Sequence, residues 1–253
     1  VFTNIFNDQN DIIEVKKICK KNKIQLIEDN AIYFGNYYKK KKEKIFAGSF
    51  GDYTLHSFNI MKNISGMFGG LVSTNNKDFF NYAKKEIKGY DKFPFFKYFN
   101  QCQTFLLLKI LSKNFIYKLF FLPTIKWAHK NNVKYILKIL YPSLKFKRTS
   151  VPNNYFTKIN KFSLHMIWLQ LKDKKYFELM QKTKEKNNLI YYRLLKKENI
   201  QKIKLIEINN SRFQNFNDFP IIAERKDELL NYLLNNGVET KFIQYMDCQK
   251  IFR

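Results

Sequence analysis

Cysteines occur in this sequence without any spacing that would indicate a disulfide framework or a zinc site. The chain has 253 residues and three cysteines, Cys19, Cys102 and Cys248, which are far apart and form no Cys-x-x-Cys motif. This usage fits a reducing cytosol. The sequence opens on Val-Phe-Thr-Asn-Ile-Phe, without the charged region, apolar core and cleavage site of a signal peptide. We therefore expect a cytoplasmic protein, and the absence of a starting methionine predicts that the chain is a fragment.

Acidic residues are few. The chain has 21 Asp and Glu against 46 Lys and Arg, which gives a formal net charge of +25. One explanation is the codon usage of an AT-rich genome, which also favours Asn, Ile, Phe and Tyr. The other is a basic surface that suits an anionic substrate or an anionic membrane face. The hydrophobic content of 45% and the aromatic content of 17% are those of a globular protein with one large or two small domains.

Residues 92–172 contain no acidic residue at all, but fifteen Lys or Arg. The longest uncharged run there, Tyr98–Leu108, has 11 residues, far fewer than the ~20 that a spanning helix needs. Aromatic residues and leucines interleaved with lysines are typical of an interfacial helix, so we expect residues 93–150 to contact an anionic membrane at its inner face. The alternative is a helical insertion packed on the main domain or at a dimer interface. No nucleic-acid-binding module is recognisable, so no nucleic acid is expected as a partner.

Polar side chains stand at the ends of two apolar runs that are typical of strands. The run Ile24–Ile27 leads to Asp29, whereas Tyr53–Phe58 contains Ser57, with Lys62 five residues further on. In α/β sheets, ligands bind at the carboxyl ends of the strands. A carboxylate, a hydroxyl and a lysine at this edge therefore form a candidate site.

Pyridoxal phosphate requires this combination of groups. Its aldehyde needs a lysine amine, its pyridine nitrogen needs a carboxylate that keeps it protonated, and its phosphate needs hydroxyl and backbone N–H donors. The alternative interpretation is a lysine that forms a salt bridge with an aspartate at a strand edge.

The rest of the first half predicts an α/β arrangement. A strand over Val1–Phe6, a helix with Ile12 and Ile18 on its apolar face and the strand at 24–27 form a βαβ unit, which implies a parallel sheet. The lysine run Lys39–Lys42 predicts a solvated loop. The segment Ser65–Gly70 predicts a turn before a strand over 71–74 and a helix over 77–88, with Phe79 and Phe80 on the inner face of that helix.

Further along the chain, two long amphipathic helices and a small α/β segment are expected. The helices are predicted over Tyr155–Leu171 and Tyr176–Lys196. Short strands over Ile203–Ile208 and Phe219–Ala223 surround a helix over Lys226–Leu234.

Four blocks of residues resemble the signature of the DegT/StrS family of nucleotide-sugar aminotransferases. The family pattern runs roughly I-E-D-x-A, G-x-x-G-D, S-F-x-x-x-K-N and G-G. The matching segments, in the same order and at matching spacings, are Ile27–Ala31, Gly48–Asp52, Ser57–Asn63 and Gly69–Gly70. The resemblance implies that Lys62 is the Schiff-base lysine, Asp29 the partner of the pyridine nitrogen and Ser57 a phosphate ligand. Ala31 is expected beside the cofactor, and no metal is expected.

The same resemblance implies a type I pyridoxal-phosphate-dependent transferase fold, with a mostly parallel sheet flanked by helices and a partial small carboxy-terminal α/β domain. We expect residues 1–92 to be part of the large domain, 93–150 a helical insertion, and 151–253 the connecting helices and the incomplete small domain. The implied protein is a homodimer with sites at the subunit interface. The family's phosphate loop and ring-stacking aromatic are expected upstream of Val1, so the fragment alone is expected to be inactive.

The implied reaction moves an amino group from an amino acid, glutamate in our expectation, to a keto nucleotide-sugar, in surface polysaccharide or amino-sugar biosynthesis. Three positions depart from the family pattern. Ile32 stands where the family has Gln or His, Phe68 where it has Glu, and Phe156 where it has the Asn of Asn-Tyr-Arg. These departures favour an alternative, a non-catalytic relative that serves as a membrane-surface or scaffold component of polysaccharide assembly.

Overall fold

The computed structural model describes residues 1–5, 9–40, 43–60, 62–133, 135–136, 155–198, 202–208, 218–238 and 240. The chain forms two compact units, one made of residues 1–101 and 156–222, the other of 102–155 and 223–253. The predicted domain boundaries at 92/93 and 150/151 stay predictions, and the second of them lies outside the described part of the chain.

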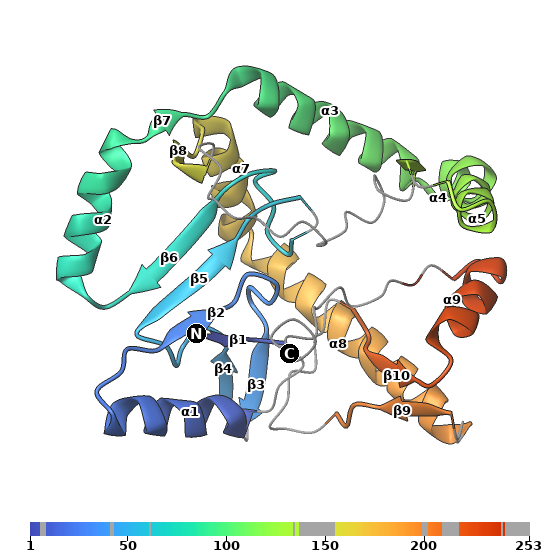
Figure 1. The fold of residues 1–253 in the computed structure, drawn as a ribbon, viewed down its shortest axis with the longest axis horizontal. Coiled ribbons are helices and arrows are strands. Elements are labelled where there is room, and N and C mark those ends of the chain that lie inside the picture. Colours follow the sequence, from blue (N-terminus) through green and yellow to red (C-terminus); the bar gives the residue numbers. More distant parts are fainter. Residues whose placement is uncertain are drawn as a thin grey trace, which may run out of the picture. The chain divides into compact units, whose positions relative to one another are not determined.

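The first unit contains a four-stranded sheet of mixed direction (Figure 1). Its strands are β1 (Phe2–Thr3), β2 (Ile27–Asp29), β5 (Tyr53–Ser57) and β6 (Gly70–Thr74), in the order β1-β2-β5-β6. The pairs β1–β2 and β2–β5 are parallel, and β6 is antiparallel to β5. The predicted mostly parallel α/β sheet is therefore confirmed.

Two details of the βαβ unit differ from the prediction. Strand β2 begins at Ile27, and Ile24 is 58% exposed because the chain there is still leaving α1 (Gln9–Lys21), with the Ile24 N–H bonded to the Cys19 carbonyl at 2.8 Å. On α1 itself, Ile12 is fully buried, whereas Ile18 is exposed. The apolar face of α1 is thus shorter than its sequence pattern.

Helix α2 (Lys77–Gly89) follows β6 and begins after Asn76, whose side chain accepts a hydrogen bond from the Phe79 N–H at 2.9 Å. The Phe79 ring packs against the Tyr53 ring of β5, with centroids 4.8 Å apart. Phe80, which was predicted to lie on the same inner face, is exposed. Phe79 therefore packs this helix on the sheet.

A β-hairpin replaces the solvated loop that the lysine run predicted. Strands β3 (Tyr37–Lys40) and β4 (Glu43–Phe46) pair in antiparallel register, with Tyr38 opposite Ile45. Tyr37 and Tyr38 are almost completely buried. Burial of Tyr37 and Tyr38 stabilises the hairpin, because the free energy gained by burying the two rings exceeds the cost of ordering the lysine run.

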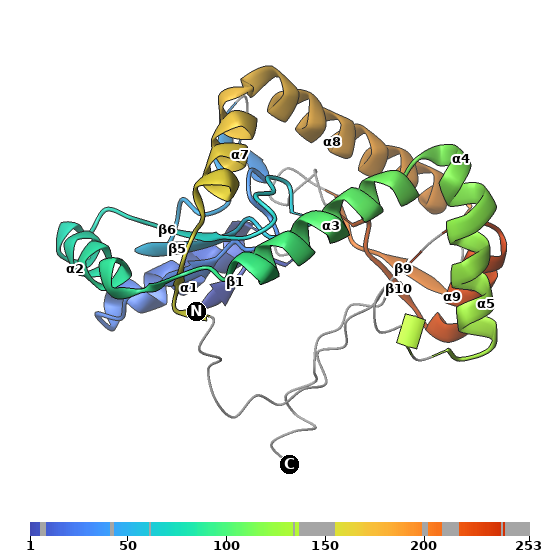
Figure 2. The same ribbon diagram turned by 90° about the horizontal axis from the view of Figure 1, so that it is seen from above.

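Helices α7 (Lys161–Lys172) and α8 (Lys174–Lys197) follow one another with a change of direction at Asp173 (Figure 2). The Asp173 carboxylate accepts from the Tyr176 N–H at 3.0 Å and so caps α8. The prediction that a helix begins at Tyr155 was wrong. Thr157–Lys158 form strand β8, parallel to β7 (Asp91–Lys92), and α7 starts only after the capping residue Asn160.

The remaining elements lie mostly after β7 and after α8. They are α3 (Phe95–Leu111), α4 (Asn114–Ile116), the π-helix η1 (Tyr117–Phe121), α5 (Leu122–Lys130), the paired strands β9 (Ile203–Leu205) and β10 (Ile221–Ala223), and α9 (Lys226–Asn235). In the second unit, Lys126 of α5 donates to the Asn235 carbonyl at the end of α9, at 2.8 Å. Among the described helices, none combines the length and the apolarity that crossing a membrane would require.

Candidate functional site

The carboxyl ends of β2 and β5 meet at one edge of the sheet, because these strands are parallel neighbours. Asp29 ends β2 and Ser57 ends β5. The register pairs Asp29 with Leu55, two residues before Ser57, so the side chains of Asp29 and Ser57 lie on the same face. Strand spacing and rise place their Cα atoms about 8 Å apart. The sheet thus brings together the predicted carboxylate and the predicted hydroxyl.

The Asp29 carboxylate is fixed by the backbone that follows it. Its Oδ1 atom accepts a hydrogen bond from the Ala31 N–H at 3.0 Å. This short turn of the chain holds the carboxylate at the end of the strand. Ala31 takes part in the site through its backbone, and both residues are half-buried.

Lys62 lies in the loop that joins β5 to β6, at the same edge of the sheet. The residue is half-buried, and its N–H donates to the Asn59 carbonyl at 3.3 Å. The cofactor interpretation and the salt-bridge interpretation of Lys62 and Asp29 both stay predictions.

A side chain of helix α7 contacts the backbone of the loop between β5 and β6, which carries Lys62 and is called the lysine loop. Gln170 accepts a hydrogen bond from the Ser65 N–H at 3.1 Å and donates one to the Ser65 carbonyl at 2.7 Å. The side-chain amide thereby pairs with both backbone groups of a residue three positions after Lys62. Such a two-point contact fixes the path of the loop as well as its distance from the helix.

Helix α8 holds the same loop through Asn63. The Asn63 amide donates to the Phe34 carbonyl at 2.7 Å, and its oxygen accepts a hydrogen bond from the ammonium of Lys184. Burial lowers the pKa of Lys184 to about 8, and the charge of Asp218 opposes this shift. The residue next to Lys62 is thus held from both sides.

Apolar packing completes this anchorage. The loop residue Ile64 is fully buried with Phe58 and with Ile167 of α7. A Cβ atom on Gly66 would lie 2.7 Å from the Ile167 Cδ1 atom, and Gly69 has a φ of +126°. The glycines at 66 and 69 therefore allow the turn and a close approach to α7.

Glu28, between Ile27 and Asp29, faces the opposite side of the sheet, and sequence reasoning missed its role. Its carboxylate is completely buried and accepts hydrogen bonds from Asn4 Nδ2 at 2.8 Å, from the Gly48 N–H at 2.7 Å and from the N–H groups of Phe50 and Gly51 at 3.0 Å each. The Gly-x-x-Gly segment therefore forms a cage of backbone donors for a buried charge. The spacing of Gly48 and Gly51 was the sequence signal for this backbone N–H cage.

His56 lies on the same face of the sheet as Glu28, because Glu28 pairs with Thr54, two residues before His56 on β5. Its ring packs edge-on against Phe34 at 5.2 Å between centroids. Burial lowers the pKa of His56, and the charge of Glu28 opposes this effect. The imidazole is therefore separated by the sheet from the face that carries Asp29 and Ser57.

The three departures from the family pattern make apolar contacts. Ile32 packs against the buried cluster of Tyr33, Tyr38 and Ala47. The Phe68 ring lies 4.0 Å from that of Phe93, and the Phe156 ring lies 5.6 Å from that of Tyr90, between centroids. These side chains contribute packing at positions where polar groups were expected.

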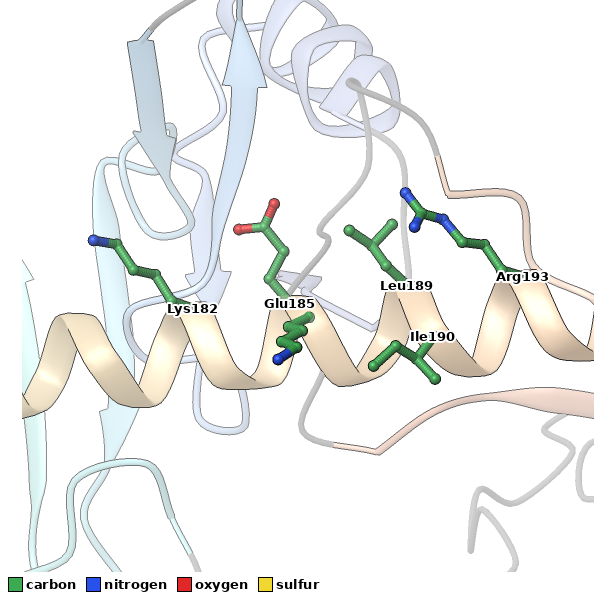
Figure 3. Close-up of a pocket in the computed structure, with 6 residues that line it drawn as sticks. Lys182, Glu185, Leu189, Ile190 and Arg193 are labelled. Carbon is green, nitrogen blue, oxygen red and sulfur yellow. The ribbon is translucent and has the colours of Figure 1, made fainter.

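A shallow cavity of about 360 Å³ lies elsewhere, along α8. Figure 3 shows Lys182, Glu185, Leu189 and Arg193 projecting from one side of this helix. Glu185 accepts a hydrogen bond from the Tyr37 hydroxyl at 2.8 Å, and burial together with this contact raises the pKa of Tyr37. None of the predicted site residues lines the cavity.

The residues at the sheet edge fit pyridoxal phosphate by their chemistry. A carboxylate held by a neighbouring N–H and a hydroxyl lie on one face of the sheet, and a lysine lies on the loop that follows at the same edge. Within the described residues, no cluster of three or more His, Cys, Asp and Glu side chains offers a metal site.

The α/β fold matches that of solved aminotransferase structures over about half of their length. An aminotransferase of the DegT/DnrJ/EryC1/StrS type from Brucella abortus aligns with 98% of this chain and 51% of its own length, at a TM-score of 0.58 and 13% identity. Helicobacter pylori PseC, an aminotransferase of pseudaminic acid biosynthesis, aligns with 95% of this chain and 52% of its own, at 0.54 and 19%.

Residues 1–92 match the model of the DegT/DnrJ/EryC1/StrS aminotransferase family. A curated relative from Campylobacter jejuni, UDP-4-amino-4,6-dideoxy-N-acetyl-beta-L-altrosamine transaminase, is 37% identical over 71 residues, which are 28% of this chain and 18% of that protein. The fold also matches an Escherichia coli GDP-4-keto-6-deoxy-D-mannose-3-dehydratase with a TM-score of 0.56, 16% identity and coverage of 98% and 54% of the two chains. The chain thus spans about half the length of these solved structures.

Proposed function

We propose that the whole protein is a pyridoxal-phosphate-dependent sugar aminotransferase. It would move an amino group from an amino acid, glutamate in our proposal, to a keto group on a nucleotide-diphosphate sugar, in surface polysaccharide or amino-sugar biosynthesis. The observation that carries this proposal is the position of Asp29, Ser57 and Lys62 at one sheet edge, within the segments that match the family. The partial match to a UDP-sugar transaminase supports the substrate class.

Each residue of the site has a separate role in this proposal. Pyridoxal phosphate, when bound, supplies an electron sink for the bond that breaks at the substrate carbon. Asp29 holds the proton at the ring nitrogen, and Ser57 donates to the phosphate. Lys62 supplies the amine that binds the aldehyde and, as a free amine, moves the proton at the substrate carbon.

The anchored loop supports the role assigned to Lys62. A catalytic side chain must be held within about half an ångström of its productive position, which requires rigid supports behind it. Gln170 and Lys184 come from two different helices and fix the loop at Ser65 and Asn63. The backbone on the carboxyl side of Lys62 is therefore preorganised before any ligand binds.

The partners follow from the same proposal. The whole protein would act as a cytoplasmic homodimer, and its excess of basic residues, at a net charge of +25 in this chain, would attract an anionic nucleotide sugar.

Cofactor attachment to Lys62 is the direct test. The full-length protein is incubated with pyridoxal phosphate, reduced with borohydride and digested, and the modified peptide is identified by mass spectrometry. We expect the label on Lys62 and no label there in Lys62→Ala, whereas Lys85→Ala, a change on the exposed face of α2, keeps it. Labelling of another lysine in the native protein would refute the assignment.

A second candidate is a non-catalytic relative that acts as a membrane-surface or scaffold component of polysaccharide assembly. The observation that favours it is the apolar packing of Ile32, Phe68 and Phe156 at positions where the family carries polar groups. Failure of the native full-length protein to retain pyridoxal phosphate through gel filtration would support this candidate over the enzyme.

A further inference from the structure

Helix α3 (Phe95–Leu111) presents a row of large apolar side chains to solvent. The members of this row, named the α3 stripe, are Phe95, Phe96, Phe99, Leu106, Leu107 and Ile110, and each is between 48% and 78% exposed. At 100° per residue these six positions fall within about 120° of the helix circumference. They therefore lie on one side of the helix, which they share with the exposed Gln103.

On the opposite side, the first turn of α3 contacts α7 within the first unit. Tyr98 contacts the Phe162 ring of α7 edge-on, with centroids 5.9 Å apart. Phe105 and Leu108, which are also on that side, are half-buried. The α3 stripe is thus separate from the side of the helix that packs against the rest of the chain. Contiguous exposed apolar surface of this kind marks an interaction site.

The charge around the stripe has one sign. Lys97 and Lys109 are exposed and flank it on its two sides, and Lys113 and Lys118 follow its carboxyl end. The stretch 92–172 holds fifteen Lys or Arg and no acidic residue. The side chains around the stripe therefore complement an anionic partner that also accepts large apolar groups.

We propose that the α3 stripe is a docking surface for an anionic lipid bilayer, with α3 in the plane of the membrane interface. Apolar side chains would enter the boundary between headgroups and acyl chains, and the flanking lysines would contact the lipid phosphates. A second copy of the chain fits less well. A two-fold contact through this face brings the lysines of both copies together, with no acidic side chain in the stretch to compensate them.

This proposal does not depend on cofactor binding, and vesicle co-sedimentation tests it. The full-length protein is mixed with vesicles of neutral phosphatidylcholine or of phosphatidylcholine with phosphatidylserine. We expect sedimentation with the anionic vesicles only, and its loss at high ionic strength, because salt screens the lysine–phosphate attraction.

Two pairs of substitutions assign the binding to α3. Leu106→Gln with Leu107→Gln removes apolar insertion and is expected to weaken binding by about tenfold or more. Its matched control, Phe80→Gln with Tyr82→Gln, changes two α2 side chains that are 58% and 62% exposed, and should leave binding unchanged. Lys109→Glu with Lys113→Glu should weaken binding by roughly fivefold or more per lysine. Its control is Lys84→Glu with Lys88→Glu, the same spacing on α2.

Several results would overturn the proposal. Equal binding to neutral and anionic vesicles would remove the electrostatic part, and unchanged binding in both α3 variants would place the contact elsewhere. Sedimentation of no protein, together with a dimer in light scattering that the α3 variants dissociate, would assign the stripe to a second copy. Circular dichroism checks each variant for folding, and the charge variant, whose two positions are exposed, tests the surface if the leucine variant fails to fold.

Discussion

Gln170 on α7 pairs with both backbone groups of Ser65, at 3.1 Å to the N–H and 2.7 Å to the carbonyl. These two residues are 105 positions apart in the chain. Together they fix the loop that carries Lys62 to a helix that belongs to a different part of the sequence. The position of the candidate catalytic lysine therefore depends on a glutamine far away in the sequence.

Removing that amide should loosen the loop without removing its apolar contacts. Gln170→Leu keeps the volume of the side chain and loses both hydrogen bonds, which should cost about 2 kcal/mol of unfolding free energy. Urea denaturation measures this cost. Gln103→Leu, a change at an exposed position of α3, is the control and should stay within about 0.5 kcal/mol of the native value. A smaller loss for Gln170→Leu than for the control would contradict the anchoring role.

The buried Glu28 carboxylate should tolerate no neutral replacement. Glu28→Gln retains one acceptor oxygen and directs an NH₂ group at backbone N–H donors, of which Gly48, Phe50 and Gly51 supply three. We expect a loss of about 3 kcal/mol or more, because hydrogen bonds to charged groups are strong and the displaced donors stay buried. Thermal unfolding monitors the change. Glu14→Gln on the exposed face of α1 serves as the comparison and should be nearly neutral.

Packing between the lysine loop and α7 gives a third prediction. Gly66→Ala would place a Cβ atom 2.7 Å from the Ile167 Cδ1 atom and 2.9 Å from the Ser163 carbonyl, so the loop or the helix must shift. We expect destabilisation of about 1–3 kcal/mol. A Cβ atom on Gly89, at the end of α2, meets nothing within 4 Å. Gly89→Ala should therefore be neutral or stabilising in the same denaturation assay, and equal effects of the two changes would argue against the tight contact at Gly66.

Lys184 should make stability depend on pH in a definite direction. Its pKa is about 8 in the folded protein and takes the ordinary value of 10.5 when unfolded. Between these two pH values the unfolded chain binds more protons at this residue, so the free energy of unfolding rises with pH across that window. Lys184→Met lacks this titration. The difference in unfolding free energy between the native protein and this variant should therefore increase from pH 8 to pH 10.5; a flat difference would mean that the folded pKa is not lowered.

The placement of the candidate site residues could be predicted from the sequence. These residues stand at the ends of strands, and strand alternation gives the face on which each side chain lies. Asp29 and Ser57 end neighbouring parallel strands, and periodicity alone places both on one face of the sheet. These predictions needed only the order of the strands and the residues at their ends.

The contacts that hold the lysine loop could not be predicted, because they join residues that are far apart in the sequence. Lys184 and Asn63 are 121 positions apart, and no local pattern links an interior residue of a helix to a loop at that separation. The hairpin β3–β4 was missed because the lysine run dominated the local pattern, whereas the burial of Tyr37 and Tyr38 is decided by tertiary contacts. The start of α7 was placed too early because Asn160 was not recognised as its cap.

The adjacent carboxylates of β2 make the spacing of the chain before them critical. Glu28 belongs to one side of the sheet and Asp29 to the other, and a strand alternates its side chains with a period of two. If a single residue inserted between Ile24 and Ile27 shifted the strand by one position, the two acids would change faces. The backbone cage would then face Ile27, and Glu28 would take the position of Asp29. Five residues (22–26) connect α1 to β2. The length of this connection thus determines two properties, the stability of the sheet and the identity of the acid at its edge.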